Sequence, residues 1–258
     1  NSNKVMFQGK DAEIEYNMWC TMLGINATKK EVKKVDKKSP SNYFFHSIGS
    51  DEVGTGDFFG PVVVCAAYLS GQHLDFVKGL KIDDSKKITD DRIRIIGEQL
   101  IDRIPYSMLA LHNSKFNEMT KQGYNMNKLK AYLHNSAILQ LTNKIKEKTT
   151  VIVDQFAEEK LYFNYLKNEN KIYRDITFTT KAESKYASVA VASIIARYAF
   201  LQYFDKLSAQ CGYDLLKGAG KKVDMLAATI IKERGESFLN SIAKTNFVTI
   251  EKAKRLLK

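Results

Sequence analysis

The pattern of hydrophobic and polar positions predicts a mixed α/β domain that begins near Tyr43 and fills the rest of the chain. Short β-branched and apolar runs predict strands, and longer stretches with apolar residues every three or four positions predict helices. Strands are expected at 43–47, 62–69, 106–112, 149–154 and 176–180. Helices are expected at 89–103, 127–148, 158–166 and 182–207, followed by two or three shorter helices from 221 onward.

The first 42 residues follow a different pattern. Residues 1–24 predict one short strand (4–8) and one amphipathic helix (11–23), which cannot bury a core by themselves. Residues 25–42 are polar and rich in lysine and end in Ser-Pro-Ser, as is typical of a linker. We therefore expect a remnant of another domain at 1–24, a linker at 25–42, and one large domain at 43–258.

Charge narrows the class of partner. The formal net charge of the 258 residues is +11, and residues 217–258 carry ten Lys and Arg against four Asp and Glu. Such a balance favours a polyanionic partner such as nucleic acid, because phosphate contacts release condensed counterions. A well-solvated basic surface is the alternative interpretation of the same charge.

The cysteines and histidines do not suggest a disulfide framework or a zinc site. Cys20, Cys65 and Cys211 are scattered, odd in number and without CxxC spacing, so buried free thiols in the cytoplasm are expected. The longest nearly apolar run, 61–69, has the length of a strand and not of a membrane span. The histidines lack HxH or HExxH spacing and are expected to be structural or surface residues: His46, His73, His112 and His134.

Isolated acids lie at the ends of predicted elements. Asp51 and Glu52 follow the first strand of the large domain, Asp154 ends the strand 149–154, and Glu183 opens the helix 182–207. Strand ends are where α/β sheets place their sites, and a carboxylate cluster needs a cation to relieve its repulsion. Oxygen ligands suit Mg²⁺ or Mn²⁺, and two such ions hydrolyse phosphodiesters. The alternative is that each acid only caps a helix, and sequence separation does not show that they converge.

A glycine-rich segment surrounds the first two acids. Gly49-Ser-Asp-Glu-Val-Gly-Thr-Gly-Asp-Phe-Phe-Gly60 is expected to be a loop whose backbone approaches a ligand closely. It fits neither GxxxxGK[ST] nor GxGxxG, which argues against a nucleotide cofactor.

Three segments carry a resemblance to a known family. Asp51-Glu-Val-Gly-Thr-Gly-Asp-Phe-Phe-Gly-Pro-Val-Val-Val64 resembles the type 2 ribonuclease H family, and Asp83-Asp-Ser-Lys-Lys-Ile-Thr89 looks like its Asp-Ser-Lys segment. Thr180-Lys-Ala-Glu-Ser-Lys-Tyr186 with 189–197 resembles its fourth motif, and the likeness covers about residues 43–258. The resemblance implies a ribonuclease H-like mixed sheet flanked by helices, with a helical C-terminal region.

The branch of the family follows from the fourth acid. Ribonuclease HII usually carries Asp there, whereas ribonuclease HIII carries Glu, and this chain has Glu183. Lys4–Glu13 also looks like the end of the N-terminal domain of ribonuclease HIII, which resembles the TATA-binding protein. Both features favour ribonuclease HIII with most of that N-terminal domain missing.

The resemblance implies roles for individual residues. Asp51, Glu52, Asp154 and Glu183 would be the catalytic residues and would bind two Mg²⁺ or Mn²⁺ ions. The backbone of Gly54, Thr55 and Gly56 would face the 2′-hydroxyls of the RNA strand, which distinguish RNA from DNA. Ser85, Lys86 and Lys181 would contact nearby phosphates.

The expected activity is endonucleolytic hydrolysis of the RNA strand of RNA–DNA hybrids, leaving 5′-phosphate and 3′-hydroxyl ends, by a cytoplasmic monomer with no membrane partner. Three alternatives stay open. They are cleavage at single ribonucleotides as in ribonuclease HII, another two-metal nuclease, and a non-catalytic nucleic-acid-binding module.

Overall fold

A five-stranded sheet in the order β3-β2-β1-β4-β5 forms the centre of the computed structural model, which describes residues 12–24, 43–82 and 88–257. Strands β1 and β2 are antiparallel, as are β2 and β3, whereas β4 is parallel to β1 and β5 is parallel to β4. The C-terminal ends of β1, β3, β4 and β5 therefore share one edge with the start of β2. The strands are β1 (Ser47–Val53), β2 (Val62–Leu69), β3 (Tyr106–Leu111), β4 (Thr150–Asp154) and β5 (Ile176–Thr179).

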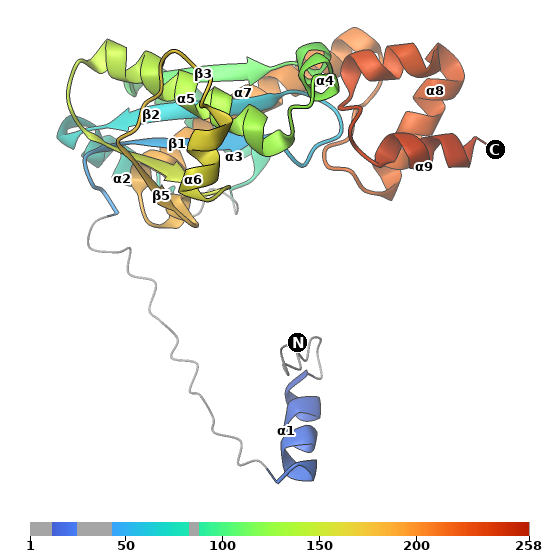
Figure 1. Cartoon of the computed structure of the whole chain (residues 1–258), viewed down its shortest axis with the longest axis horizontal. Coiled ribbons are helices and arrows are strands. Elements are labelled where there is room, and N and C mark those ends of the chain that lie inside the picture. The colour runs from blue at the N-terminus through green and yellow to red at the C-terminus, as the bar shows by residue number, and fades with distance from the viewer. Residues whose placement is uncertain (1–11, 25–42, 83–87, 258) are drawn as a thin grey trace. The chain divides into compact units, whose positions relative to one another are not determined.

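Helices cover both faces of this sheet (Figure 1). α7 and α3 pack on one face and α5 packs on the other. In the large unit, the α-helices are α2 (Leu74–Gly79), α3 (Asp90–Arg103), α4 (Asn113–Lys121), α5 (Met126–Ile145), α6 (Glu159–Tyr165), α7 (Ala187–Cys211), α8 (Lys221–Ile242) and α9 (Thr249–Leu256). The described residues of this unit also contain the 3₁₀ turns η1 (Gly71–His73) and η3 (Ala182–Ser184).

The two-sided covering explains the composition of β2. Every residue of this strand is buried, with Cys65 and Ala67 packed in the cluster that contains α7 and α3. Val64 and Ala66 pack in the cluster that contains α5. A central strand buried on both faces needs an unbroken apolar run, not an alternating one.

α7 is the core helix of the domain. Within the described residues it alone is long and apolar enough to cross a membrane, but most of it is buried inside the protein. It lies so close to β1 that a Cβ added at Gly49 would stand 2.1 Å from the backbone nitrogen of Val189. Glycine at this position therefore sets the distance between helix and strand.

Two sequence-based predictions of local structure are wrong. A strand was expected at 43–47 and a loop at 49–60, but β1 spans Ser47–Val53 and carries Asp51 and Glu52 within it. A helix was expected to start at 182, but Glu183 lies in η3 and α7 begins only at Ala187. In β1 the polar side chains have tertiary partners: Ser193 for Asp51, and Lys130 and His134 for Glu52.

The chain divides into two units, Asn1–Lys38 and Ser39–Lys258. The described part of the first unit, residues 12–24, contains α1 (Ala12–Met22), which matches the predicted amphipathic helix and exposes Ile14, Met18 and Trp19. The predicted strand 4–8 and the linker 25–42 lie outside the described residues. The domain boundaries and the resemblance of the first unit to a TATA-binding-protein-like domain stay predictions.

The helices α8 and α9 form the C-terminal region that the sequence predicted, and Figure 1 shows them together at one end of the large unit. α8 packs against α4 and α9 and is interrupted at Gly235, where φ is +82°. Glycine adopts this conformation without the steric cost that other residues meet.

Candidate active site

Strand alternation separates the side chains of Asp51 and Glu52. Neighbouring residues of a strand point to opposite faces. Asp51 lies on the face covered by α7, where the Ser193 hydroxyl hydrogen bonds to its carboxylate. Glu52 lies on the face covered by α5, where it meets Lys130 and His134. The two acids are thus held by different helices.

The Asp51 carboxyl group is buried, with 8% of the residue exposed. Its pKa is raised to about 8, chiefly by burial and further by the negative charges of Glu52 and then Asp154. The hydrogen bonds from Ser193 and from the backbone N–H of Glu52 (2.8 Å) act in the opposite direction but are outweighed. Asp51 is therefore a carboxylate whose ionisation calls for a nearby positive charge.

Glu52 has two positively polarised partners. Lys130 Nζ donates to Oε1 at 2.6 Å, and His134 Nε2 donates to Oε2 at 2.9 Å. Burial alone would raise the pKa of Glu52, but the hydrogen bonds and charges of His134 and Lys130 outweigh burial and lower it. Glu52 is thus held in its ionised form by α5.

Asp154 ends β4 on the same face of the sheet as Asp51. Ile152, two residues earlier, packs with Ala182 and Val189 in one cluster, and strand alternation places Asp154 on that side. Its Oδ1 accepts a 2.7 Å hydrogen bond from the backbone N–H of Ala182. Glu183 is the next residue after Ala182 and is buried. The turn η3 therefore brings the backbone of the fourth acid to the end of β4.

The oxygen-rich donor set fits a hard divalent cation. The buried carboxylate of Asp51, destabilised by two acidic neighbours, is the observation that favours such an ion at this edge. Across the described ranges, however, no three His, Cys, Asp or Glu side chains are already arranged to hold a metal. The Glu52 carboxylate is hydrogen bonded to α5, and the Asp154 carboxylate is hydrogen bonded to the backbone of η3.

The Gly-Thr-Gly segment begins where β1 ends. Gly54 has φ +91°, and a Cβ there would stand 2.2 Å from the carbonyl oxygen of Pro61, so only glycine fits. Gly56 is exposed, and a Cβ there would meet nothing within 4 Å. Gly54 thus shapes the loop, whereas Thr55 and Gly56 remain accessible to a ligand.

Lys244 anchors the rest of this loop from the C-terminal region. Its side chain is fully buried, and Nζ donates to the carbonyl oxygens of Asp57 (2.7 Å) and Gly60 (2.6 Å). Burial lowers its pKa to about 8. The Asp57 carboxylate accepts a 2.6 Å hydrogen bond from the backbone N–H of Gly218. Residues near the end of the chain therefore fix the loop beside the acids.

The other predicted substrate contacts have different outcomes. Lys181 is exposed and adopts a left-handed backbone conformation, φ +55°, immediately before η3, which places it near Asp154. Ser85 and Lys86 lie outside the described residues. Their predicted contacts with phosphate stay predictions.

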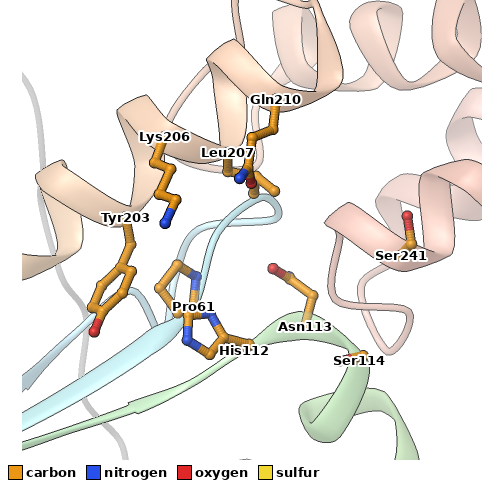
Figure 2. A pocket seen from close by; sticks show the side chains of 9 residues that line it. All are labelled: Pro61, His112, Asn113, Ser114, Tyr203, Lys206, Leu207, Gln210 and Ser241. Carbon is orange, nitrogen blue, oxygen red and sulfur yellow. The ribbon is translucent and has the colours of Figure 1, made fainter.

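A cavity of about 290 Å³ lies on the same edge of the sheet as the acids, at the start of β2 and the end of β3. In Figure 2 the Lys206 side chain extends from α7 toward Pro61. Among the residues that the structure describes, no acidic side chain lines the cavity. The residues around it are Pro61, His112, Asn113, Ser114, Tyr203, Lys206, Leu207, Gln210 and Ser241.

Sequence reasoning missed Lys130, His134, Ser193 and Lys244. A signal for the first two exists, because both lie on the helical face marked by the apolar residues Leu133 and Ala137, where charge is unexpected. No comparable signal distinguishes Ser193 within a long apolar helix. Lys244 is far from the loop in the sequence, so the sequence does not reveal their contact.

Comparison with known proteins gives consistent matches. Residues 48–250 match the family model described as Ribonuclease HII. Ribonuclease HIII of Staphylococcus saprophyticus is 45% identical, with 100% of this chain and 84% of the relative covered. Ribonuclease HIII of Bacillus cereus is 44% identical, with 100% and 85% covered.

Solved structures agree with these matches. The crystal structure of Bst-RNase HIII in complex with Mn²⁺ superimposes with a TM-score of 0.81 at 38% identity, covering 97% of this chain and 82% of that chain. The ribonuclease H2 from Pyrococcus horikoshii OT3 shares the fold, with a TM-score of 0.67 at 23% identity over 82% of this chain and 99% of that one. The predicted ribonuclease H-like fold is confirmed.

Proposed function

We propose that Asp51, Glu52, Asp154 and Glu183 form the metal-dependent catalytic centre of this chain. The chain belongs to the ribonuclease HIII family and is an endoribonuclease that acts on RNA–DNA hybrids. The observation that carries this proposal is the buried Asp51 carboxyl group, whose pKa is raised to about 8 by burial and by its acidic neighbours. Such a group requires a cation to be ionised at neutral pH. The complex of Bst-RNase HIII with Mn²⁺ supports a divalent ion in this role.

The four acids would hold two Mg²⁺ or Mn²⁺ ions. Bound divalent ions supply Lewis acidity that activates water and stabilises the leaving oxygen of a phosphodiester. The chain's own residues prepare the site: Ser193 and the Glu52 N–H orient Asp51, and the Ala182 N–H orients Asp154. Products with 5′-phosphate and 3′-hydroxyl ends follow.

Selection of RNA is proposed to rest on the backbone of the Gly-Thr-Gly segment. Gly56 and Thr55 are accessible at the end of β1, next to Asp51 and Glu52. Backbone groups there would contact the 2′-hydroxyls that only an RNA strand presents. Lys181, exposed beside η3, would contact a nearby phosphate.

A phosphate farther along the duplex would be held by the cavity of Figure 2. The cavity lies by β2 and β3, which are roughly 5 Å and 10 Å from β1 at a strand spacing of about 4.8 Å. Lys206 supplies a positive charge there, and none of the described residues that line the cavity is acidic. The net charge of +11 supports the same kind of partner. We propose a monomer acting in the cytoplasm without a membrane partner.

The test is cleavage of a labelled RNA–DNA hybrid with Mg²⁺ or Mn²⁺, compared with duplex DNA and with DNA that carries a single ribonucleotide. Asp154→Asn is expected to lose activity, whereas Asp175→Asn, an exposed acid just before β5, serves as the matched control. Activity of Asp154→Asn equal to that of the wild type would refute the assignment. Equal cutting of duplex DNA would favour another two-metal nuclease. Cutting at the single ribonucleotide would add the activity expected of ribonuclease HII.

A further inference from the structure

α5 directs two basic side chains toward one carboxylate. Lys130 and His134 are four residues apart, so they lie on the same helical face, and they bind different oxygens of Glu52. Lys130 is 8% exposed and His134 is 0% exposed. Buried basic groups of this kind are costly unless they are paired, so their location requires a reason.

Further contacts fix both basic residues. Phe156 stacks on the His134 ring, with ring centroids 5.2 Å apart and planes 23° apart. The Lys130 ammonium group lies 4.1 Å from the centre of the same Phe156 ring. The Ser50 hydroxyl lies 2.7 Å from His134 Nδ1 and donates to the Cys65 carbonyl oxygen at 2.9 Å. Each basic group therefore has a defined position before any ligand arrives.

We propose that Lys130 and His134 are positioning residues for Glu52. Lys130 would also supply a buried positive charge that reduces the repulsion among the neighbouring carboxylates. This inference rests on the proposed function of Glu52. Two donors on two oxygens hold the carboxylate in one rotamer, which lowers the cost of ordering it when an ion binds. Each carboxylate oxygen has two lone pairs, so each retains one for a further partner.

Charge balance gives the second part of the argument. Asp51 is affected by the charges of both Glu52 and Asp154, so the ionised cluster repels itself. The Lys130 ammonium group touches Glu52 and offsets part of this repulsion. Removing the ammonium group should therefore weaken the metal-free protein through Glu52 and not through the packing of α5.

The first experiment measures thermal unfolding of the full chain in EDTA. Lys130→Met keeps most of the side-chain volume and removes the charge, and it should lower the unfolding temperature by about 5 °C. In a Glu52→Gln background the same substitution should change that temperature by less than about 2 °C, because the interaction is already lost. Lys128→Met is the matched control. Lys128 also lies on α5, and its ammonium group also lies over an aromatic ring, 3.7 Å from the centre of Tyr124.

The second experiment measures hybrid cleavage at saturating Mn²⁺. Lys130→Met should lower kcat at least about tenfold and leave KM within about twofold, because a misplaced Glu52 affects the reacting centre and not the binding of the hybrid. Lys130→Arg should recover part of kcat because it restores the donor and the charge. Lys130→Gln serves as a second variant in case Lys130→Met does not fold.

The outcomes separate the possible explanations. If Lys130→Met lowers the unfolding temperature equally in the wild-type and the Glu52→Gln backgrounds, Lys130 only packs α5, and the inference is overturned. So would a kcat equal to that of Lys128→Met. If the wild-type chain does not cut the hybrid, the proposed function fails, whereas the metal-free coupling between Lys130 and Glu52 still tests the positioning.

Discussion

Replacing Asp51 by asparagine should make the metal-free protein more stable while it abolishes activity. The Asp51 carboxyl group is buried beside Glu52 and Asp154, and its pKa is raised from 3.8 to about 8. Asparagine has nearly the same shape, and its oxygen can still accept the hydrogen bond from the Glu52 N–H. The substitution therefore removes the charge with little loss of packing.

The magnitude follows from the linkage between proton binding and folding. For an acid whose folded-state pKa is raised, the folded state keeps a proton that the unfolded chain releases, so stability falls as pH rises from about 4 to about 8. At pH 7 the penalty is at most about 4 kcal/mol, at 1.36 kcal/mol for each pH unit above the unfolded pKa. This corresponds to an upper limit of roughly 8–16 °C in unfolding temperature for a domain of this size.

The assay is thermal unfolding in EDTA at pH 5 and at pH 8, with hybrid cleavage measured in parallel. The gain of Asp51→Asn over the wild type should be larger at pH 8 than at pH 5, and cleavage should be lost. Asp75→Asn is the control, because its side chain is fully exposed. A gain that does not depend on pH, or a loss of stability at pH 8, would refute this account of the acidic cluster.

Three further predictions concern the surroundings of the acids. Lys206→Ala should raise KM for the hybrid and reduce the slope of log affinity against log salt by about 1, because one phosphate contact is lost; an unchanged salt slope would exclude the cavity as a phosphate site. Gly49→Ala should cost about 3 kcal/mol or more in urea unfolding, since the added Cβ would stand 2.1 Å from the Val189 nitrogen, whereas Gly56→Ala should not affect stability. For Lys244, whose pKa is lowered to about 8, the unfolded chain holds its proton more tightly than the folded state between about pH 8 and 10.5. Wild-type stability relative to Lys244→Met should therefore rise by about 2 kcal/mol between pH 7 and pH 9.5, and a constant difference would contradict this.

Elements whose own residues determine them were predicted well from the sequence. β2 and β4 are continuous apolar runs. The helix expected at 89–103 is α3, which starts at Asp90 after Thr89, whose side chain accepts a hydrogen bond from the Arg92 N–H. β1 was missed because Gly49 and Ser50 interrupt its apolar pattern. These two residues are explained only by tertiary contacts, Gly49 with α7 and Ser50 with His134 on α5.

The acids of the candidate site were predicted from the sequence, but the residues that hold them in place were not. The positions of Asp51, Glu52, Asp154 and Glu183 came from strand ends and from the family resemblance. The sequence did not reveal that Asp51 and Glu52 face opposite sides of β1, because the segment that carries them was predicted as a loop and not as a strand. Nor did it reveal the basic partners of Glu52, since their contact joins residues 78 and 82 positions apart.

The central claim is that the four acids act together on divalent ions at one edge of the sheet. The most direct measurement is anomalous diffraction from crystals of the full chain soaked in Mn²⁺. We predict manganese at the ends of β1 and β4, within coordination distance of the Asp51 and Asp154 carboxylates and with Glu52 and Glu183 in the same cluster. Manganese bound elsewhere, or a cluster that omits Asp51, would contradict the account.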